Sequence, residues 1–266
     1  MPEGDTVWLT ARRLHRALAG RVLTLADLRV PQHATADLRG QTVKEIVSRG
    51  KHLLLRTSED LTLHTHLGMD GTWRILHAGR TVPGPGDHRV RVVLGNTEWV
   101  AIGSLLRVVE LLPSGREETA VGHLGPDLLG PDWDPDEAVR RLTEAPDEAI
   151  GDALLDQRNL AGIGNLYKAE LLFLRGVHPW TPVSDVKDID RMVRLARQLL
   201  WTNREHPEQS TTGDLRRGRS HWVYGRGGEA CRRCATLVAR GEQGPAGRQR
   251  VTFWCPTCQP ERLDRR

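Results

Sequence analysis

Residues 153–175 read ALLDQRNLAGIGNLYKAELLFLR, two helical patterns joined by a short centre that contains two glycines. The centre is Gly162-Ile163-Gly164-Asn165, and glycine there permits a tight turn and the close approach of another backbone. Asn165 then begins a helix whose free N–H groups and dipole can hold a phosphate. The segment therefore predicts a helix, a turn and a helix that either contact a polyanion or form a simple capped hairpin.

All four cysteines lie further along the chain, as Cys231 with Cys234 and Cys255 with Cys258. Each pair has Cys-x-x-Cys spacing, and 20 residues separate the pairs. Two such turns present four thiolates that complete a tetrahedral zinc site. We expect one structural Zn²⁺, because four cysteine ligands leave no position open for water. Two disulfides or four free thiols are the alternatives.

Two arginines, Arg248 and Arg250, precede the second cysteine pair on a predicted hairpin strand that ends at 251–254. They are either solvated side chains or contacts to phosphate. Residues 210–230 are rich in Gly, Ser, Thr and Arg without a clear period, and this composition predicts a mobile basic loop.

The first half of the chain has a different texture. Residues 3–19 predict a helix that ends at Gly20, since apolar residues recur there at helical spacing. From 22 to 112, short apolar runs alternate with Gly, Pro, Asn and Asp, which indicates a β-sandwich or barrel. The clearest runs are 42–47, 52–56, 61–67, 90–94 and 105–112.

Between these regions lies an acidic stretch. The formal net charge is +4 over 1–112, −7 over 113–150, +1 over 151–203 and +6 over 204–266. Two basic parts joined by an acidic segment fit a protein that grips a polyanion, although a solvated surface explains the charges equally well. Further helices are predicted near 136–144, 148–157, 165–175 and 187–203.

Neither a membrane span nor a secretory signal is evident. No apolar run approaches the roughly 18 residues that a span requires, and the chain opens with acidic residues in an amphipathic pattern. The paired cysteines favour metal binding in a reducing compartment. We therefore expect a cytoplasmic protein.

The N-terminus carries the candidate nucleophile. If Met1 is removed, Pro2 presents a secondary amine, and an α-amino group near pKa 7.7–8.0 is far less protonated at neutral pH than an ordinary lysine. Such an amine can attack a sugar C1′ and form an iminium. Glu3 follows directly and can exchange protons with it. The plain alternative for Glu3 is a carboxylate that stabilises a helix N-terminus.

Several of these segments together resemble the formamidopyrimidine-DNA glycosylase and endonuclease VIII family along essentially the whole chain. The matching pieces, in order, are Met1-Pro-Glu-Gly-Asp5, Arg49-Gly-Lys51, Asp156-Gln157 through Gly162-Ile-Gly-Asn165, Val223-Tyr-Gly-Arg226 and the four cysteines. The opening Gly4-Asp-Thr-Val-Trp8 is similar to the actinobacterial endonuclease VIII branch.

The resemblance implies an α+β fold with two lobes: an N-terminal helix plus β-sandwich, then a helical domain with a helix–two-turn–helix and a zinc ribbon. It implies that Pro2 forms a Schiff base, that Glu3 is the general acid/base and that Lys51 binds phosphate and acts at the sugar. Asn165 and Arg250 would hold the phosphates flanking the extruded nucleotide. We expect four parts: a catalytic domain (1–112), an acidic linker (113–135), a helical DNA-binding domain (136–222) and the ribbon (223–266).

Substrate choice rests on smaller differences. An extruded base leaves a gap that apolar side chains fill, and Met69 in Leu67-Gly-Met69-Asp70 is the candidate wedge. The formamidopyrimidine branch usually carries Asp-x-Arg-Arg-Phe-Gly, whereas the corresponding stretch here, 101–109, reads AIGSLLRVV. The Gln-Leu-Tyr wedge of some endonuclease VIII proteins is also absent. The resemblance therefore favours oxidised pyrimidines over 8-oxoguanine.

The resulting prediction is a bifunctional DNA glycosylase and AP lyase that acts as a monomer on damaged, preferably double-stranded DNA and does not bind membranes. The alternatives are an 8-oxoguanine glycosylase of the same fold and a non-catalytic damaged-DNA-binding protein. Three histidines, His52, His64 and His66, could suggest a metal site. Histidines satisfied at a strand end are the preferred interpretation, because no carboxylate lies at ligand spacing in the sequence.

Overall fold

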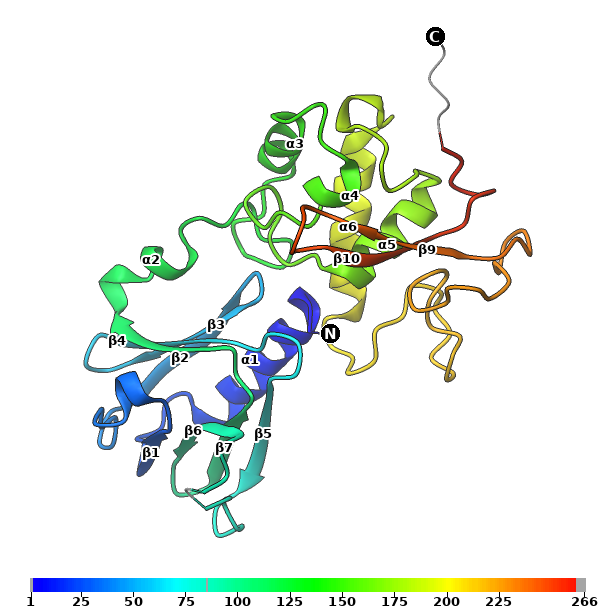
Figure 1. The fold of residues 1–266 in the computed structure, drawn as a ribbon. Helices are drawn as coiled ribbons and strands as arrows, with labels where there is room; N and C mark the ends of the chain where they lie inside the picture. The colour runs from blue at the N-terminus through cyan, green and yellow to red at the C-terminus, as the bar shows by residue number, and fades with distance from the viewer. Residues whose placement is uncertain (1, 85, 262–266) are drawn as a thin grey trace. The chain divides into compact units, whose positions relative to one another are not determined.

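The structure is a computed structural model that describes residues 2–84 and 86–261. Its contacts divide the chain into two compact units, 1–123 and 124–266, called here the N-terminal and C-terminal units (Figure 1). Met1 and residues 262–266, the end of the predicted ribbon, lie outside the described residues. None of the helices searched among the described residues is long and apolar enough to cross a membrane.

The N-terminal unit is a sandwich of two four-stranded antiparallel sheets, with strand orders β1-β6-β7-β5 and β2-β3-β4-β8. The predicted sandwich is therefore confirmed. The strands are β1 (Leu25–Leu28), β2 (Val43–Arg49), β3 (His52–Thr57), β4 (Leu61–His66), β5 (Thr72–His77), β6 (Val90–Gly95), β7 (Trp99–Ser104) and β8 (Val108–Pro113).

One predicted strand, 105–112, begins later than its apolar pattern indicates. Leu105 has a positive φ of 52°, and this left-handed conformation breaks an extended strand. Strand β8 therefore starts at Val108. A short 3-10 turn, η1 (Pro31–His33), is the remaining element between β1 and β2.

Helix α1 (Gly4–Leu18) closes the sandwich and contacts strands of both sheets. Its buried residues follow the predicted helical spacing, and full burial of an aliphatic side chain contributes about 1.5–3 kcal/mol. The backbone N–H of Gly20 donates to Val43 O at 2.8 Å, and that of Ile46 donates to Nδ1 of His15 at 3.1 Å. The helix therefore runs antiparallel to β2, and its N-terminus lies toward the end of β2 that leads into Lys51.

Side-chain alternation gives the β2-β3-β4-β8 sheet two different faces. Leu53, Leu55, Leu63 and Val109 belong to the buried core cluster of this unit. The residues between them in sequence point to the opposite face. That face carries Leu54 and a row of polar side chains: His52, His64, His66 and Glu110.

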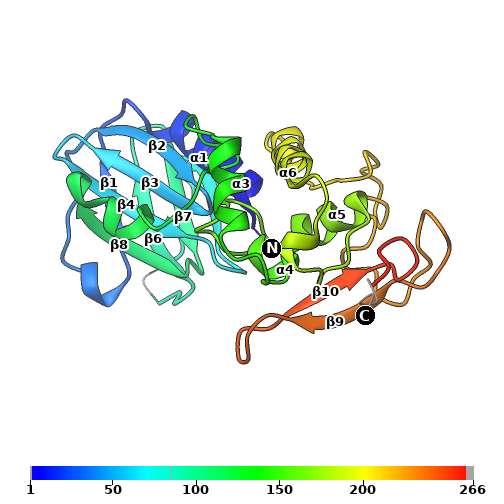
Figure 2. The same cartoon turned by 90° about the horizontal axis from the view of Figure 1, so that it is seen from above.

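The C-terminal unit is built around one buried helix. Helix α5 (Asn165–Arg175) is buried from Asn165 through Phe173. It contacts α6 (Ile189–Asn203) and strand β10 (Arg250–Trp254), so it lies between them (Figure 2). Strand β10 pairs antiparallel with β9 (Ala239–Gln243), which confirms the predicted hairpin before the second cysteine pair.

The helix predicted over 148–157 is wrong in length: only Ile150–Ala153, helix α4, is helical. The side chain of Gln157 explains the early end. Its Nε2 donates to Leu155 O at 2.9 Å and to Ile163 O at 3.0 Å, and its Oε1 accepts from the N–H of Gly162 at 3.1 Å. These bonds stabilise a loop that leads to α5.

The acidic stretch contains ordered elements. After β8 come η2 (Ser114–Arg116) and α2 (Glu118–Val121), and α3 (Pro135–Thr143) follows. The carboxylate of Asp134 caps α3 by accepting from the N–H groups of Asp136 and Glu137. Leu124 and Leu128 are buried in the intervening segment. The last short element is η3 (Val183–Asp185).

Candidate active site

The N-terminus of α1 presents the two residues predicted to carry the chemistry. Glu3 is the N-cap residue of α1, in extended conformation, and its side chain is completely buried. Pro2, directly before it, is half-buried. Glu3 therefore holds a carboxyl group, which can exchange protons, one residue from the Pro2 nitrogen and at a helix N-terminus.

Lys51 lies in the tight turn between β2 and β3. The start of α1 lies at the same end of the sandwich as this turn (Figure 1). Gly50 precedes it with a φ of 55°, a left-handed conformation that glycine adopts without steric cost. The turn holds Lys51 half-buried rather than fully solvated.

His66 is the last residue of β4, and Met69 lies in the connection from β4 to β5, which passes from one sheet to the other. The Nδ1 of His66 accepts from the N–H of Gly68 at 2.9 Å, and the N–H of Gly71 donates to Leu67 O at 3.0 Å. A Cβ at Gly71 would lie 2.2 Å from Leu67 O, so this turn requires glycine. The turn leaves Met69 68% exposed, as a wedge candidate must be.

The polar face of the sheet contains more chemistry than the sequence indicated. His64 is buried, and its Nδ1 lies 2.9 Å from Oε2 of Glu110 while its Nε2 lies 2.8 Å from Nδ1 of His52. No carboxylate lies at ligand spacing from these histidines in the sequence, but the fold brings Glu110 to His64. Glu110 lies directly opposite His64 in the β4–β8 pairing, which the linear sequence does not reveal.

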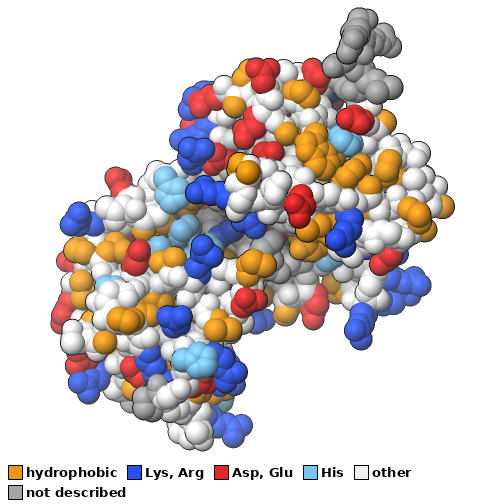
Figure 3. Space-filling view, viewed as in Figure 1, with side chains coloured by type: hydrophobic (Ala, Val, Ile, Leu, Met, Phe, Trp, Pro, Cys, Tyr) orange, Lys and Arg blue, Asp and Glu red, His pale blue; other side chains and the backbone are white. Residues whose placement is uncertain are grey.

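Burial and neighbouring positive groups lower the pKa of His52 to about 3 and that of His66 to about 4. Lys51 contributes to both shifts, because a nearby cation disfavours a second positive charge. Both rings are therefore neutral at physiological pH. On the face of the molecule shown in Figure 3, histidine side chains gather on the N-terminal unit beside Lys and Arg side chains.

In the C-terminal unit, the structure brings Asn165 close to the strand that carries Arg250. Nδ2 of Asn165 donates to the carbonyl oxygen of Val251 at 2.7 Å. Asn165 is the first residue of α5, after the N-cap Gly164, and Arg250 is the exposed first residue of β10. The strand that carries Arg250 is thus held at the N-terminus of α5, a helix end that favours anions.

A completely buried lysine reinforces the same junction. Nζ of Lys168 lies 2.6 Å from Oγ1 of Thr252 and 3.2 Å from Oε1 of Gln243. The Nε2 of Gln243 in turn donates to Pro179 O at 2.8 Å. A buried ammonium group that lost these partners would be costly, so the network holds both hairpin strands against α5.

The four cysteine side chains converge, with all four Sγ atoms within 4.8 Å of one another. The Sγ atoms of Cys231 and Cys258 lie 4.0 Å apart, and those of Cys234 and Cys255 lie 3.4 Å apart. A tetrahedral zinc with Zn–S bonds of 2.3 Å requires S···S separations of about 3.8 Å. The thiols therefore fit a four-coordinate zinc, and among the described residues they are the only group of this kind.

Glu170 organises the segment predicted as a loop over 210–230. Its completely buried carboxylate accepts from the backbone N–H groups of Trp222, Val223 and Tyr224 at 2.7–2.8 Å and from the hydroxyl of Thr211. This segment contains no helix or strand, as predicted. The four hydrogen bonds to the Glu170 carboxylate nevertheless hold Thr211 and the backbone of 222–224 in a defined conformation.

Comparison with known families finds two matches along this chain. Residues 1–104 match the family model described as the formamidopyrimidine-DNA glycosylase N-terminal domain, and residues 124–214 match the formamidopyrimidine-DNA glycosylase H2TH domain. The chain belongs to the formamidopyrimidine-DNA glycosylase and endonuclease VIII family.

Relatives of this family member place it in the endonuclease VIII branch, as its N-terminal sequence predicted. It is 54% identical over 262 residues to the "Probable endonuclease 8 2" of Streptomyces coelicolor, covering 97% of this chain and 94% of the relative. It is 51% identical over 259 residues to the "DNA-(apurinic or apyrimidinic site) lyase Nei2" of Mycolicibacterium smegmatis, covering 97% and 99%.

Solved structures of the family share the fold. MutM in complex with DNA containing carbocyclic 8-oxo-G has a TM-score of 0.80 at 23% identity, covering 98% of this chain and 100% of that one. The Lactococcus lactis formamidopyrimidine-DNA glycosylase with AP-site DNA has a TM-score of 0.79 at 24% identity, covering 97% and 100%. At these identities the likeness establishes the architecture alone.

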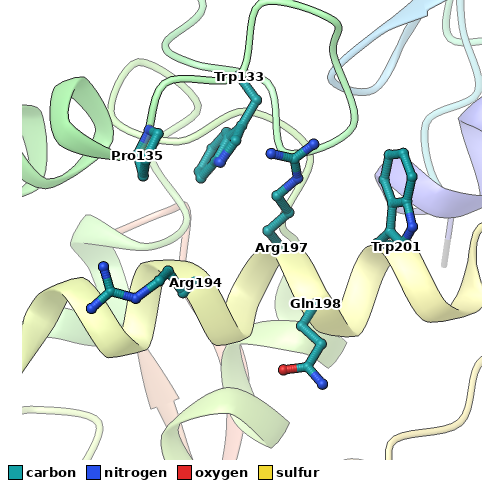
Figure 4. A pocket seen from close by; sticks show the side chains of 6 residues that line it. All are labelled: Trp133, Pro135, Arg194, Arg197, Gln198 and Trp201. Carbon is teal, nitrogen blue, oxygen red and sulfur yellow. The ribbon is translucent and has the colours of Figure 1, made fainter.

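This family member also has a groove that sequence reasoning missed. Trp133, Arg197 and Trp201 line a cavity of about 590 Å³ next to α6, together with Pro135, Arg194 and Gln198 (Figure 4). The Arg197 guanidinium lies 5.4 Å from the Trp133 ring and 5.3 Å from the Trp201 ring. The contact with Trp133 fastens the segment before α3 to α6, whereas Trp201 belongs to α6 itself.

Other missed residues had a partial signal in the sequence. Lys168 and Glu170 are charged residues within a helix whose pattern is apolar on several sides, and a charge in such a helix needs a buried partner. Nothing local indicated which partner. Glu110 had no comparable signal, since its contact with His64 depends on strand pairing.

Proposed function

We propose that this chain excises oxidised bases from DNA, with pyrimidines favoured, and nicks the strand by β,δ-elimination through a Schiff base at Pro2. Its family consists of DNA glycosylases and lyases, and its relatives at 51–54% identity are named endonuclease 8 or AP lyase. The observation that carries the proposal is the buried Glu3 beside Pro2, at the end of the sandwich where the Lys51 turn lies.

The chemistry follows from the amine and the carboxyl group. The neutral Pro2 nitrogen bonds to C1′ as the bond from C1′ to the base breaks, and the base leaves with a proton. Glu3 delivers a proton to the ring oxygen of the sugar, so the ring opens and a Pro2 iminium forms. The iminium accepts electrons when C2′ and then C4′ lose protons. These losses break the C3′–O and C5′–O bonds, and hydrolysis of the imine releases the enzyme.

Lys51 is assigned to the phosphate and sugar of the damaged nucleotide, and Met69 to the gap left by the extruded base. Asn165 and Arg250 are assigned to the flanking phosphates, supported by their junction through Val251. We assign the catalytic domain to residues 1–112, the linker to 113–135, the helical DNA-binding domain to 136–222 and the zinc ribbon to 223–266. The proposed state is a cytoplasmic monomer on duplex DNA.

A zinc ion held by Cys231, Cys234, Cys255 and Cys258 would stabilise the ribbon without entering the reaction. Four thiolates saturate its coordination, so it offers no position for water or substrate. The ribbon packs on the core of the unit through Ala169, Phe173, Val223 and Val238. The metal would thereby contribute to the position of the strand that carries Arg250.

Borohydride trapping tests the proposal. Protein with a free Pro2 amine is incubated with duplexes that carry 5-hydroxyuracil, dihydrouracil, 8-oxoguanine or an abasic site. We expect covalent products with the pyrimidine lesions and the abasic site, and their loss in Pro2→Gly. Trapping mainly with 8-oxoguanine would instead support the other branch. Absence of trapping on every duplex and single strand would support a protein that only binds damage.

A matched pair of preparations isolates the nucleophile. One retains a blocked N-terminus and the other has the free amine, with all other residues identical. The blocked protein should bind abasic-site DNA with unchanged affinity and leave it intact. Equal nicking by both preparations would exclude Pro2 as the nucleophile.

A further inference from the structure

A chain of hydrogen-bonded side chains runs from the surface toward the Lys51 turn. It begins at Glu110, whose side chain is 54% exposed, and continues 2.9 Å to Nδ1 of His64, which is 4% exposed. From Nε2 of His64 it continues 2.8 Å to Nδ1 of His52, the residue directly after Lys51. These hydrogen bonds thus connect the solvent-exposed Glu110 with His52, beside the Lys51 turn.

The hydrogen bonds define which ring nitrogens carry protons. An ionised carboxylate only accepts, so His64 donates to Glu110 from Nδ1, and its Nε2 accepts when the ring is neutral. His52 must then donate to His64 from Nδ1, which leaves Nε2 of His52 as an acceptor. His66 has the opposite form: its Nδ1 accepts from the N–H of Gly68, so its Nε2 carries the proton.

The surroundings keep His52 uncharged. Its ring centroid lies 5.0 Å from that of His64, 4.9 Å from that of His66 and 6.1 Å from that of His123. Burial and the charges of these rings and of Lys51 lower the pKa of His52. The other charged groups that face this cluster are Arg107, near His66, and Glu117, near His64.

We propose that Glu110, His64 and His52 form a proton relay that removes protons released beside Lys51 during strand elimination. Nε2 of His52 accepts the proton as the Nδ1 proton of His52 moves to Nε2 of His64, so the His52 ring stays uncharged throughout. The Nδ1 proton of His64 moves to the Glu110 carboxylate, which releases it to water. After the product leaves, Nε2 of His52 loses its proton to water and the reverse shift, with a proton taken up at Glu110, restores the original tautomers.

In this arrangement His52 is the proton acceptor, whereas His64 and Glu110 are positioning residues that act through it. The relay rests on the proposed lyase function, because β- and δ-elimination each release a proton. A metal site is not the better explanation: among the described residues, the cysteines are the only group of metal-ligating side chains that converge on one point. The relay also explains why a partly exposed carboxylate lies opposite a buried histidine.

Nuclear magnetic resonance of ¹⁵N-histidine protein tests the geometry without any catalytic readout. We expect His52 and His64 to carry hydrogen on Nδ1 and His66 to carry it on Nε2 between pH 6 and 8. Glu110→Ala should alter the ring signals of His64 and His52 and leave those of His77, on the other sheet, unchanged. Hydrogen on Nε2 of His52 in the wild-type protein would overturn the proposal.

Single-turnover nicking of a duplex with a preformed abasic site tests the function. Glu110→Gln and His64→Gln can keep hydrogen bonds but cannot pass a proton, so nicking should slow about tenfold or more, with the steepest loss at low pH. Borohydride trapping should keep its wild-type rate in both. Glu98→Gln is the matched control, since Glu98 is 60% exposed and pairs with Arg21, and neither residue belongs to the proposed relay.

The outcomes separate the relay from the lyase function. If the wild-type protein is not trapped, the Schiff-base function fails, while the tautomer measurement still decides the geometry. If it is trapped and both glutamine variants nick as fast as wild type, the relay is wrong. If both variants lose trapping and nicking alike, the residues serve only the structure.

Discussion

Asn165 donates a hydrogen bond of 2.7 Å from Nδ2 to the carbonyl oxygen of Val251, a residue 86 positions later. The bond ties the first residue of α5 to the strand whose exposed first residue is Arg250. A helix N-terminus attracts anions, and Arg250 directly precedes the bonded residue Val251 on the strand. Two segments that the sequence indicated separately therefore form one candidate phosphate site.

Replacement of Asn165 should affect both stability and DNA binding. In Asn165→Ala the Val251 carbonyl loses its donor, which should lower the free energy of unfolding by about 1 kcal/mol. Affinity for abasic-site DNA should fall about tenfold, because the variant loses the Asn165 side-chain amide and no longer holds β10 and its Arg250 in place. Urea unfolding and fluorescence anisotropy measure the two effects. A variant of wild-type affinity would remove Asn165 from the DNA-binding surface.

Arg250 and Arg248 form a matched pair for a salt-dependence experiment, since both are exposed arginines of the same hairpin. Only Arg250 adjoins the carbonyl held by Asn165. Arg250→Ala should weaken binding to all sequences about equally and reduce the slope of log K against log salt by about one. Arg248→Ala should change the slope much less. An equal effect of both substitutions would indicate a diffuse basic surface instead of a phosphate site.

Metal removal tests the ribbon. Purified protein should contain one zinc per chain, and a chelator should release it and expose the four thiols. The metal-free protein should lose hydrogen-exchange protection in β9 and β10 and much of its DNA affinity, because zinc supplies folding energy to such small modules. The N-terminal unit has its own core and should keep its protection. Protein that contains no metal yet binds DNA fully would contradict the assignment.

Glu170 should be among the most sensitive positions in the C-terminal unit. Its carboxylate accepts three backbone N–H groups, and Glu170→Gln would turn an amide donor toward one of them. Charge-assisted bonds of this kind contribute about 1.5–3 kcal/mol each, so we expect a loss of about 2–4 kcal/mol in unfolding free energy. Amide exchange at 222–224 should accelerate in parallel. Unchanged exchange there would show that other contacts hold this segment.

The depressed histidine pKa values predict weaker stability in acid. In the unfolded chain His52 and His66 take up protons near pH 6.5, whereas in the fold their pKa values lie at about 3 and about 4. Above pH 6.5 both states are neutral and stability is full. As the pH falls below 6.5, only the unfolded state binds these protons, so stability declines until the folded pKa values are reached.

Urea titration at pH 7.5 and 5.0 measures this decline, which we expect to amount to about 2 kcal/mol for each ring and about 4 kcal/mol for the two together. His66→Gln should show a smaller difference between the two pH values than wild type. His77→Gln, which changes a histidine on β5 stacked against Trp99, should keep the full difference. An identical pH dependence in all three proteins would refute the assignment to His52 and His66.

Local features of the sequence determined much of this protein. Helical spacing over 3–19, short apolar runs over 22–112 and the paired cysteines each depend on residues a few positions apart, so they predict α1, the sandwich and the zinc ligands directly. The Pro2-Glu3 start and the Gly162–Asn165 turn likewise carry their chemistry in adjacent residues. Leu105 and Gln157 show the limit, because one backbone angle and one side-chain bridge shortened the elements predicted there.

Only the tertiary structure decided which distant residues meet. Strand register places Glu110 opposite His64, and His52 reaches His64 from a third strand. The fold also brings Glu170 to the backbone of 222–224 and Lys168 to Thr252. Local periodicity cannot predict such contacts, because it does not fix the register between strands. A shift of one residue in register would turn each side chain to the opposite face. The physical reason is that burial of the whole core, not any single segment, selects the register.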